Sequence, residues 1–432
     1  MNYYTIIEFL FYKLNQLIMH NTELHKVLGF SLNQQQKEVI DLLEDFSEKN
    51  NDNDVFILKG SAGTGKTSIV KALKHILQKK FIQMKICAPT ARASSIISSK
   101  TSHCSKTIHS EIYIPNPLDG GGVEMLRRDN QSDLYSIYVI DESSMISNKM
   151  SSSIDFVVSR PLLEELIDYV KQGNPRNKIV FIGDKFQLPP VNEIVSPALD
   201  IDFLSQEFKL KAKQFELTEV MRQKEDCKVL QLATQVRDSM INQKDKNDYL
   251  DIDRYHYSMG GLNQYLNLYN KDKIDSVIMI CGANKNVETW NRLIRSNLGF
   301  NNPFLNVGEF VMMQENWIGK GGRSILKGEF GKVININDRI QEYAGLHFVD
   351  VEIEFLSCSG TKKISSKILL EAINTRYGKL TSDKEKTFYA HVMKNNKTFR
   401  RTLKRSDDKY LGAMRLKHAY AITCHKAQGG EW

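Results

Sequence analysis

The residues best suited to chemistry form a glycine-rich loop that ends in a lysine and two hydroxyl groups. The loop reads Gly60-Ser61-Ala62-Gly63-Thr64-Gly65-Lys66-Thr67-Ser68. It matches the pattern G-x-x-x-x-G-K-[ST], and it lies between an apolar run at residues 55–58 and a helical pattern at 68–77. Backbone N–H groups in such a loop surround phosphate oxygens, Lys66 reaches the β and γ phosphates, and Thr67 can coordinate Mg²⁺. The loop therefore predicts a binding site for ATP and Mg²⁺ formed by residues 60–68.

Two carboxylates follow a second apolar run. Asp141 and Glu142 come directly after residues 137–140, and ligands gather at the carboxyl ends of strands in open α/β sheets. We expect Asp141 to hold Mg²⁺ and Glu142 to polarise the attacking water, the division of labour that hydrolysis needs. The alternative is a solvated pair of acids at a strand end.

A third junction carries an uncharged polar side chain on a loop stiffened by two prolines. Residues 181–184 (FIGD) end an apolar run, and residues 185–191 (KFQLPPV) continue it. Gln187 near a γ-phosphate can sense hydrolysis and pass the change to a neighbouring surface. An ordinary proline-terminated loop is the alternative.

Short apolar runs recur along the chain and predict the strands that position these groups. They lie at residues 55–58, 85–88, 137–140, 179–182 and 277–281. Helical patterns, such as 68–77 and 162–171, lie between them, so we expect an α/β core of parallel strands. Because single cores stop growing near about 250 to 300 residues, a chain of 432 residues predicts at least two domains.

Composition limits the classes of partner and compartment. The formal net charge of +8 favours polyanionic partners, although a merely basic cytosolic protein fits as well. None of the six cysteines forms a Cys-x-x-Cys pair, so we expect neither a zinc site nor a disulfide framework. We interpret residues 4–19 as an amphipathic helix because charges interrupt their apolar pattern. A soluble cytoplasmic protein without a membrane partner is the expectation.

The order of these motifs resembles that of superfamily I helicases, and within them the RecD-like and Dda-like branch. Further segments extend the resemblance from residue 32 to residue 432: residues 32–36 (LNQQQ) resemble the Q motif, 88–93 (APTARA) motif Ia, 106–110 (KTIHS) motif Ib, 217–223 (LTEVMRQ) motif IV and 421–432 (AITCHKAQGGEW) motif V.

The resemblance implies roles for further residues around the nucleotide. It implies that Gln36 recognises adenine, that Gln187 couples nucleotide to DNA, and that Arg222 contacts the γ-phosphate from a second motor domain. A guanidinium can stabilise charge on the transferring phosphoryl group when the cleft closes. The alternative for Arg222 is a surface pair with Glu219. The expected catalytic set is Lys66, Asp141, Glu142, Gln187 and Arg222.

The resemblance also implies contacts to single-stranded DNA from short polar groups on loops. These residues are Pro89, Thr90, Arg92, Thr107, His109, Thr423, His425 and Lys426. Such groups bind phosphate and sugar without reading bases, which suits a motor that moves over any sequence. Tyr113 is the candidate for base stacking, with packing against the sheet as its alternative. For Thr107 and His109, the alternative is a structural role at a helix end.

The implied fold is a P-loop NTPase with two RecA-like domains, a hairpin insertion and an SH3-like insertion. We expect an N-terminal helical extension at 1–30, a first motor domain at 31–107 and 137–205, a hairpin at 108–136, a second motor domain at 206–325 and 412–432, and an SH3-like insertion at 326–411. Within the last, residues 388–405 interleave aromatic and basic side chains. They would grip a DNA strand, or form a solvated basic helix.

The implied function is ATP-driven unwinding of DNA by 5′-to-3′ movement along a single strand. Fork junctions and replication or recombination proteins are the expected partners, and a monomer is favoured. RNA unwinding, translocation without unwinding, and a non-hydrolysing nucleic-acid clamp remain alternatives. The family continues into a motif VI with another arginine, whereas this sequence ends with motif V, so we expect weak hydrolysis from the isolated chain.

Overall fold

The computed structural model describes most of the chain. The described ranges are 23–117, 123–150, 156–220, 228–242, 259–273, 276–319, 324–337, 339–357, 360–375 and 378–429. The helices of this part include none with the length and apolar character that a bilayer span requires.

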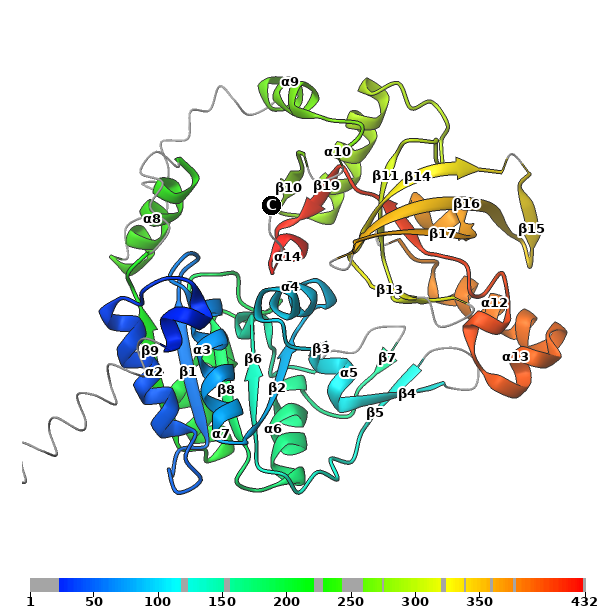
Figure 1. The fold of residues 1–432 in the computed structure, drawn as a ribbon. Coiled ribbons are helices and arrows are strands. Elements are labelled where there is room, and N and C mark those ends of the chain that lie inside the picture. Colours follow the sequence, from blue (N-terminus) through cyan, green and yellow to red (C-terminus); the bar gives the residue numbers. More distant parts are fainter. Residues whose placement is uncertain are drawn as a thin grey trace, which may run out of the picture.

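A six-stranded parallel sheet forms the first unit (Figure 1). Its order is β3 (Ser105–Thr107), β2 (Gln83–Ala88), β6 (Ser136–Ile140), β8 (Lys178–Gly183), β1 (Val55–Gly60) and β9 (Ala212–Leu217). Every neighbouring pair is parallel. The α/β core of parallel strands predicted from the sequence is confirmed.

Helices cover both faces of this sheet because successive strand residues point to opposite sides. On one face, α2 (Gln34–Phe46), α3 (Lys66–Lys79) and α4 (Ala91–Thr101) pack against Phe56, Leu58 and Val139. On the other, α5 (Ile108–Ile112), α6 (Leu162–Gly173) and α7 (Ile201–Phe208) pack against Val55 and Ile57. The interface on each face consists of apolar side chains.

Strand β9 corrects the expected boundary between the two motor domains. The expected second domain begins at residue 206, but β9 pairs with β1 along its whole length, from Val55↔Ala212 to Gly60↔Leu217. The pairing satisfies the backbone polar groups of the sheet edge, which local sequence patterns do not reveal. The first unit therefore extends at least to Leu217.

The segment between β3 and β6 forms an antiparallel pair, β4 (Tyr113–Pro117) with β5 (Val123–Arg127). Strand β7 (Phe156–Val157) adds to it in parallel. The pair extends from the first sheet towards the opposite end of the molecule (Figure 1).

The second unit contains a short parallel pair, β10 (Met279–Cys281) with β19 (Ala421–Thr423). Helix α10 (Asn284–Asn297) packs on it, α14 (Cys424–Ala427) follows β19, and α8 (Lys228–Ile241) and α9 (Met259–Leu268) precede it. Its core contains Leu262, Ile294 and Tyr420.

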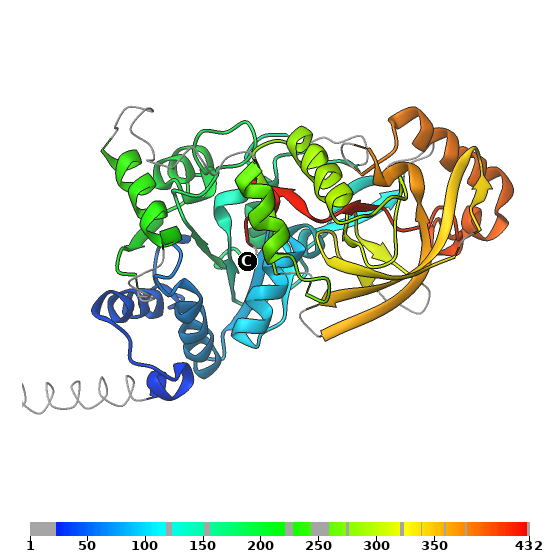
Figure 2. The same ribbon diagram turned by 90° about the horizontal axis from the view of Figure 1, so that it is seen from above.

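An antiparallel sheet, here called the β module, joins the second unit (Figure 2). Its strands run in the order β15 (Gln341–Tyr343), β16 (Leu346–Ser357), β14 (Phe330–Ile336), β11 (Phe310–Met313) and β18 (Leu416–His418), with β17 (Gly360–Leu369) also paired to β16. Nearby lie β12 (Trp317–Ile318), β13 (Ser324–Ile325), α11 (Leu370–Ile373), α12 (Ser382–Asn395) and α13 (Lys397–Thr402). The expected limits 326–411 are too narrow, because the hydrogen-bond ladder includes β11 and β18.

Candidate functional site

The glycine-rich loop connects β1 to the first turn of α3, as its sequence predicts. Gly65 has φ +91°, and a Cβ there would lie 2.3 Å from Nε2 of Gln36. A Cβ at Gly60 would lie 2.7 Å from Oγ1 of Thr64 and 3.1 Å from Cβ of Leu217. Both positions therefore favour glycine, which allows the tight loop whose backbone N–H groups can bind a phosphate.

The ammonium group of Lys66 lies inside this loop. Its Nζ donates hydrogen bonds to the carbonyl oxygens of Gly60 at 2.6 Å and Ser61 at 3.0 Å. Burial raises the pKa of Asp141 and Glu142, and the ammonium group of Lys66 opposes this rise at both carboxylates, so it lies close to them. The predicted lysine and acids are therefore brought together.

Gln36 is fully buried behind the loop. Its Nε2 donates to the carbonyl oxygen of Thr64 at 3.2 Å, and its Oε1 accepts from the backbone N–H of Asn33 at 3.1 Å. The second bond belongs to a capping box that starts α2. Both ends of the amide are thus engaged by the protein, so Gln36 braces the loop in this structure, whereas the resemblance implied contact with adenine.

Asp141 and Glu142 lie at the carboxyl end of β6. Burial raises the pKa of Asp141, while the neighbouring backbone and Lys66 lower it. Burial and then the charge of Asp141 raise the pKa of Glu142 to about 7. Glu142 also has φ +51°, a left-handed conformation that costs on the order of 1 kcal/mol or more outside glycine. A strained, more basic carboxylate next to the phosphate loop suits activation of water.

Gln187 links the β6 and β8 loops. Oγ of Ser144 donates to Oε1 of Gln187 at 3.0 Å, and Gln187 also bonds to Glu142. One residue farther on, the carbonyl oxygen of Leu188 accepts from Nε2 of Gln428 at 3.0 Å. This loop therefore contacts the acids on one side and the end of α14 on the other.

The chain after α14 reaches the nucleotide side of the first unit. Gly429 has φ +65°, and a Cβ there would lie 3.7 Å from Cγ of Glu142 and 3.0 Å from Cβ of Ala93. The two units therefore meet beside the carboxylates. Arg222, the expected arginine of the cleft, lies outside the described residues.

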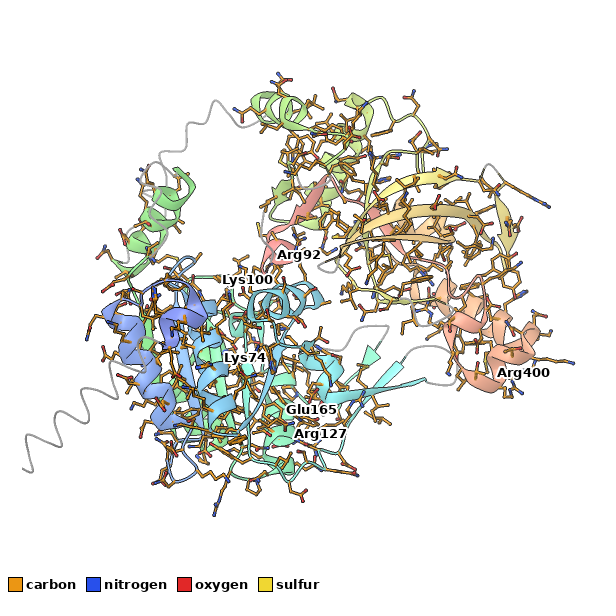
Figure 3. All side chains as sticks on the ribbon, in the orientation of Figure 1. Lys74, Arg92, Lys100, Arg127, Glu165 and Arg400 are labelled. Carbon is orange, nitrogen blue, oxygen red and sulfur yellow. The ribbon has the colours of Figure 1, made fainter. Side chains whose placement is uncertain are left out.

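A cavity of about 470 Å³ lies between α4, α14 and the β module. It brings together seven of the predicted DNA contacts, namely Pro89, Thr90, Arg92, Thr107, His109, His425 and Lys426. Figure 3 shows Arg92 on α4, next to α14 and the β module. We call this cavity the channel.

The channel is also lined by residues that the motifs did not predict. These include Met125, Met312, Met313, Asn316, Lys327, Gly328 and Gln428. Lys327 lies at the start of the expected SH3-like insertion, and this position is the one sequence feature that indicated a residue of this group. The methionines are apolar strand residues, and two of them, Met312 and Met313, belong to β11, which pairs with β14 and β18.

Two predicted contacts do not line the channel. Tyr113 is only 1% exposed and packs at the base of the hairpin, with its ring 5.7 Å from that of His109. The proposed stacking role of Tyr113 is therefore wrong, because bases cannot reach its ring. Thr423 is 8% exposed, and its Oγ1 accepts from the backbone N–H of Lys426 at 3.4 Å, so it caps α14.

The channel is electropositive. Burial and then the charges of Lys417 and Lys327 lower the pKa of Lys426 to about 8, and Nζ of Lys426 donates to Oε1 of Gln314 at 3.0 Å. Burial and Lys327 also lower the pKa of His109, which favours its neutral form. The guanidinium of Arg92 lies 5.3 Å from the ring centre of Phe330 in β14.

Comparison with known proteins identifies several relatives. The family model described as AAA domain matches residues 31–254. The ATP-dependent RecD2 DNA helicase of Deinococcus radiodurans is 26% identical over 178 residues, covering 41% of this chain and 21% of that protein. The ATP-dependent DNA helicase PIF1 of Saccharomyces cerevisiae is 26% identical over 335 residues, covering 71% of this chain and 36% of that protein. The ATP-dependent DNA helicase dda of Enterobacteria phage T4 is 26% identical over 266 residues, covering 60% of this chain and 56% of that protein. The chain thus spans a limited part of each relative.

Proposed function

Because the chain belongs to the AAA-domain family, and within it to the branch of RecD-like, Dda-like and Pif1-like helicases, we propose that it is an ATP-driven motor that moves along single-stranded DNA and unwinds duplex. The observation that carries the proposal is the loop after β8. Ser144 contacts this loop at Gln187 and Gln428 contacts it at Leu188. One loop therefore touches both the hydrolytic acids and the helix that lines the channel, as coupling of hydrolysis to movement requires.

The loop residues 60–68 would bind the phosphates of ATP. Lys66 neutralises charge on the β and γ phosphates, and Glu142 takes a proton from the attacking water. Thr67 and Asp141 offer the hydroxyl and carboxylate oxygens that Mg²⁺ prefers, so the donor set fits this ion, which would supply charge neutralisation at the phosphates. We assign to Arg222 the stabilisation of transferring phosphoryl oxygens.

The channel would hold the DNA backbone. The hydroxyl of Thr107 accepts the N–H of Ser110 at 3.1 Å, and that of Thr90 accepts the N–H of Ala93 at 3.1 Å. Each hydroxyl hydrogen is thus available to a phosphate oxygen, next to the charges of Arg92 and Lys426. Such contacts position a strand without reading its sequence. We assign 5′-to-3′ movement and fork junctions as substrates on the family resemblance.

ATP turnover with single-stranded DNA, RNA or neither polymer tests the central proposal. We expect stimulation by DNA, and a loss of turnover by about 10² to 10⁴ in Glu142→Gln with ATP binding retained. Glu48→Gln is the matched control, since Glu48 is an exposed acid paired with Lys80. Turnover in Glu142→Gln equal to that of the parent would refute the assignment of Glu142.

Substrates with a single 5′ or 3′ tail test direction. We expect unwinding of the 5′-tailed substrate, and unwinding confined to the 3′-tailed substrate would reverse the assigned polarity. If RNA stimulates ATP turnover as strongly as DNA does, the assignment of DNA as the specific substrate is wrong.

A further inference from the structure

An exposed, positively charged face runs along α12, α13 and the turn after them. It consists of Lys384, Lys386, Lys394, Lys397, Arg400, Arg401, Lys404 and Lys409, all of them exposed. Lys397 and Arg401 are one helical turn apart on α13, so they share a side of the helix. Figure 3 shows Arg400 on α13, at the outer side of the β module. We call these eight residues the basic face.

The acids of the same segment offset only part of this charge, since residues 381–409 contain four carboxylates. Glu385 pairs with Arg415 at 2.7 Å, Asp407 accepts from Oγ1 of Thr402 at 2.6 Å, and the buried Asp408 accepts from Nδ2 of Asn396 at 2.9 Å. Asp383 is the one exposed carboxylate of residues 381–409, a range that the structure describes completely. The basic face therefore presents a large excess of positive charge to solvent.

The aromatic side chains of this segment are turned inward. Phe388 and Phe399 are 1% and 0% exposed and belong to the core that fixes both helices to β16. The ring of Tyr389 packs against that of Phe399 at 5.4 Å and 82°. The expected stacking of bases on Phe388 and Phe399 is therefore wrong, because α12 and α13 bury both rings, whereas the alternative of a solvated basic helix is consistent with the exposed charges.

This combination of charge without stacking groups selects a class of partner. Proteins that hold single strands without sequence preference stack bases on aromatic rings, whereas a duplex hides its bases and presents phosphates. Membrane insertion needs exposed apolar groups, and within residues 381–409, all described, Leu403 at 37% is the one large hydrophobic counted as exposed. The basic face thus fits the phosphate backbone of a duplex.

We propose that the basic face binds duplex DNA and holds it against the β module while one strand occupies the channel. The proposal rests on the proposed function, since it adds the duplex part of the substrate to a channel for the single strand. The place of the face supports it: the hairpin β4–β5 extends towards the side of the molecule on which α12 and α13 lie (Figure 1). A duplex next to the channel would lie along that side.

The test removes charge from the basic face without disturbing its packing. The variant combines Lys394→Gln, Lys397→Gln, Arg401→Gln and Lys404→Gln. Arg400 is kept because its guanidinium donates to the carbonyl oxygens of Met393 at 2.9 Å and Lys394 at 2.6 Å. The matched control removes four exposed lysines elsewhere, at Lys26, Lys209, Lys271 and Lys273.

Affinity is measured for a blunt duplex and for a single strand over a range of salt concentrations. We expect the variant to bind duplex at least tenfold more weakly, and the slope of log K against log salt to fall by about two to four, since each lost phosphate contact contributes about 0.9. Single-strand affinity and DNA-stimulated ATP turnover should equal those of the control variant.

Three outcomes overturn this proposal: unchanged duplex affinity, equal losses for duplex and single strand, or equal losses in the control variant. Failure of the proposed function is recognised separately, because the parent protein would then show no DNA-stimulated turnover in the same samples.

Discussion

The side-chain amide of Gln36 donates a hydrogen bond to the carbonyl of Thr64 over 3.2 Å, so the start of α2 supports the phosphate loop from behind. Gly65 is the residue that leaves room for this contact, since a Cβ there would meet the amide at 2.3 Å. The shape of the loop thus depends on a residue 24 positions before Gly60.

The variant Gln36→Ala distinguishes a brace from an adenine-reading residue. Loss of two buried hydrogen bonds should destabilise the protein by about 1 to 3 kcal/mol and raise KM for ATP and GTP by the same factor. Calorimetry and nucleotide titrations check both effects. Gln35→Ala is the control, since its exposed amide bonds to Thr218 at 2.8 Å. A selective loss for ATP would show that Gln36 reads the base.

The variant Ser144→Ala tests the coupling loop. Removing the donor to Gln187 should leave basal turnover close to that of the parent and reduce its stimulation by single-stranded DNA severalfold, because Gln187 is then less well positioned. Turnover is measured against DNA concentration. Ser47→Ala is the control, since its hydroxyl bonds to the carbonyl of Glu44 at the far end of α2. Full stimulation in Ser144→Ala would argue against this path of communication.

The pKa of Lys426 predicts how DNA binding depends on pH. Burial lowers the pKa to about 8, so the ammonium form dominates below that value, and a bound phosphate raises the pKa again because it favours the charged form. Affinity for single-stranded DNA should therefore fall as pH rises through 8. Lys426→Arg should abolish the decrease, since arginine stays charged. A decrease that persists in Lys426→Arg would assign it to another group.

The burial of Tyr113 predicts a structural effect without a specific effect on unwinding. Tyr113→Phe should unwind DNA at the parental rate because the ring still fills the same space. Tyr113→Ala should destabilise the protein by about 3 to 5 kcal/mol by leaving a cavity. Unwinding rates and thermal melting measure the two. A slow but stable Tyr113→Phe variant would contradict this account.

Local patterns in the sequence predicted the first unit well. The strand at residues 55–58, the loop that follows and the helix at 68–77 appear as β1, the phosphate loop and α3, since turn glycines and apolar spacing specify them within a few residues. The AAA-domain match and the helicase relatives likewise confirm the resemblance stated from the motifs.

Features that depend on distant pairing were harder to predict. The place of β9 in the first sheet follows from its register with β1, and the limits of the β module follow from β11 and β18. Likewise, the aromatic residues at 388 and 399 alternate with basic ones in the sequence, yet α12 and α13 bury them against β16. Which side of a helix faces a core is decided by what packs there.

The final pair in the β1–β9 register, Gly60 with Leu217, has a mechanical consequence. The first glycine that surrounds the phosphates and the last residue before the chain leaves the sheet are lateral neighbours. A change in the shape of the loop around a nucleotide would therefore reach Leu217, the point at which the chain leaves the first sheet towards the second unit.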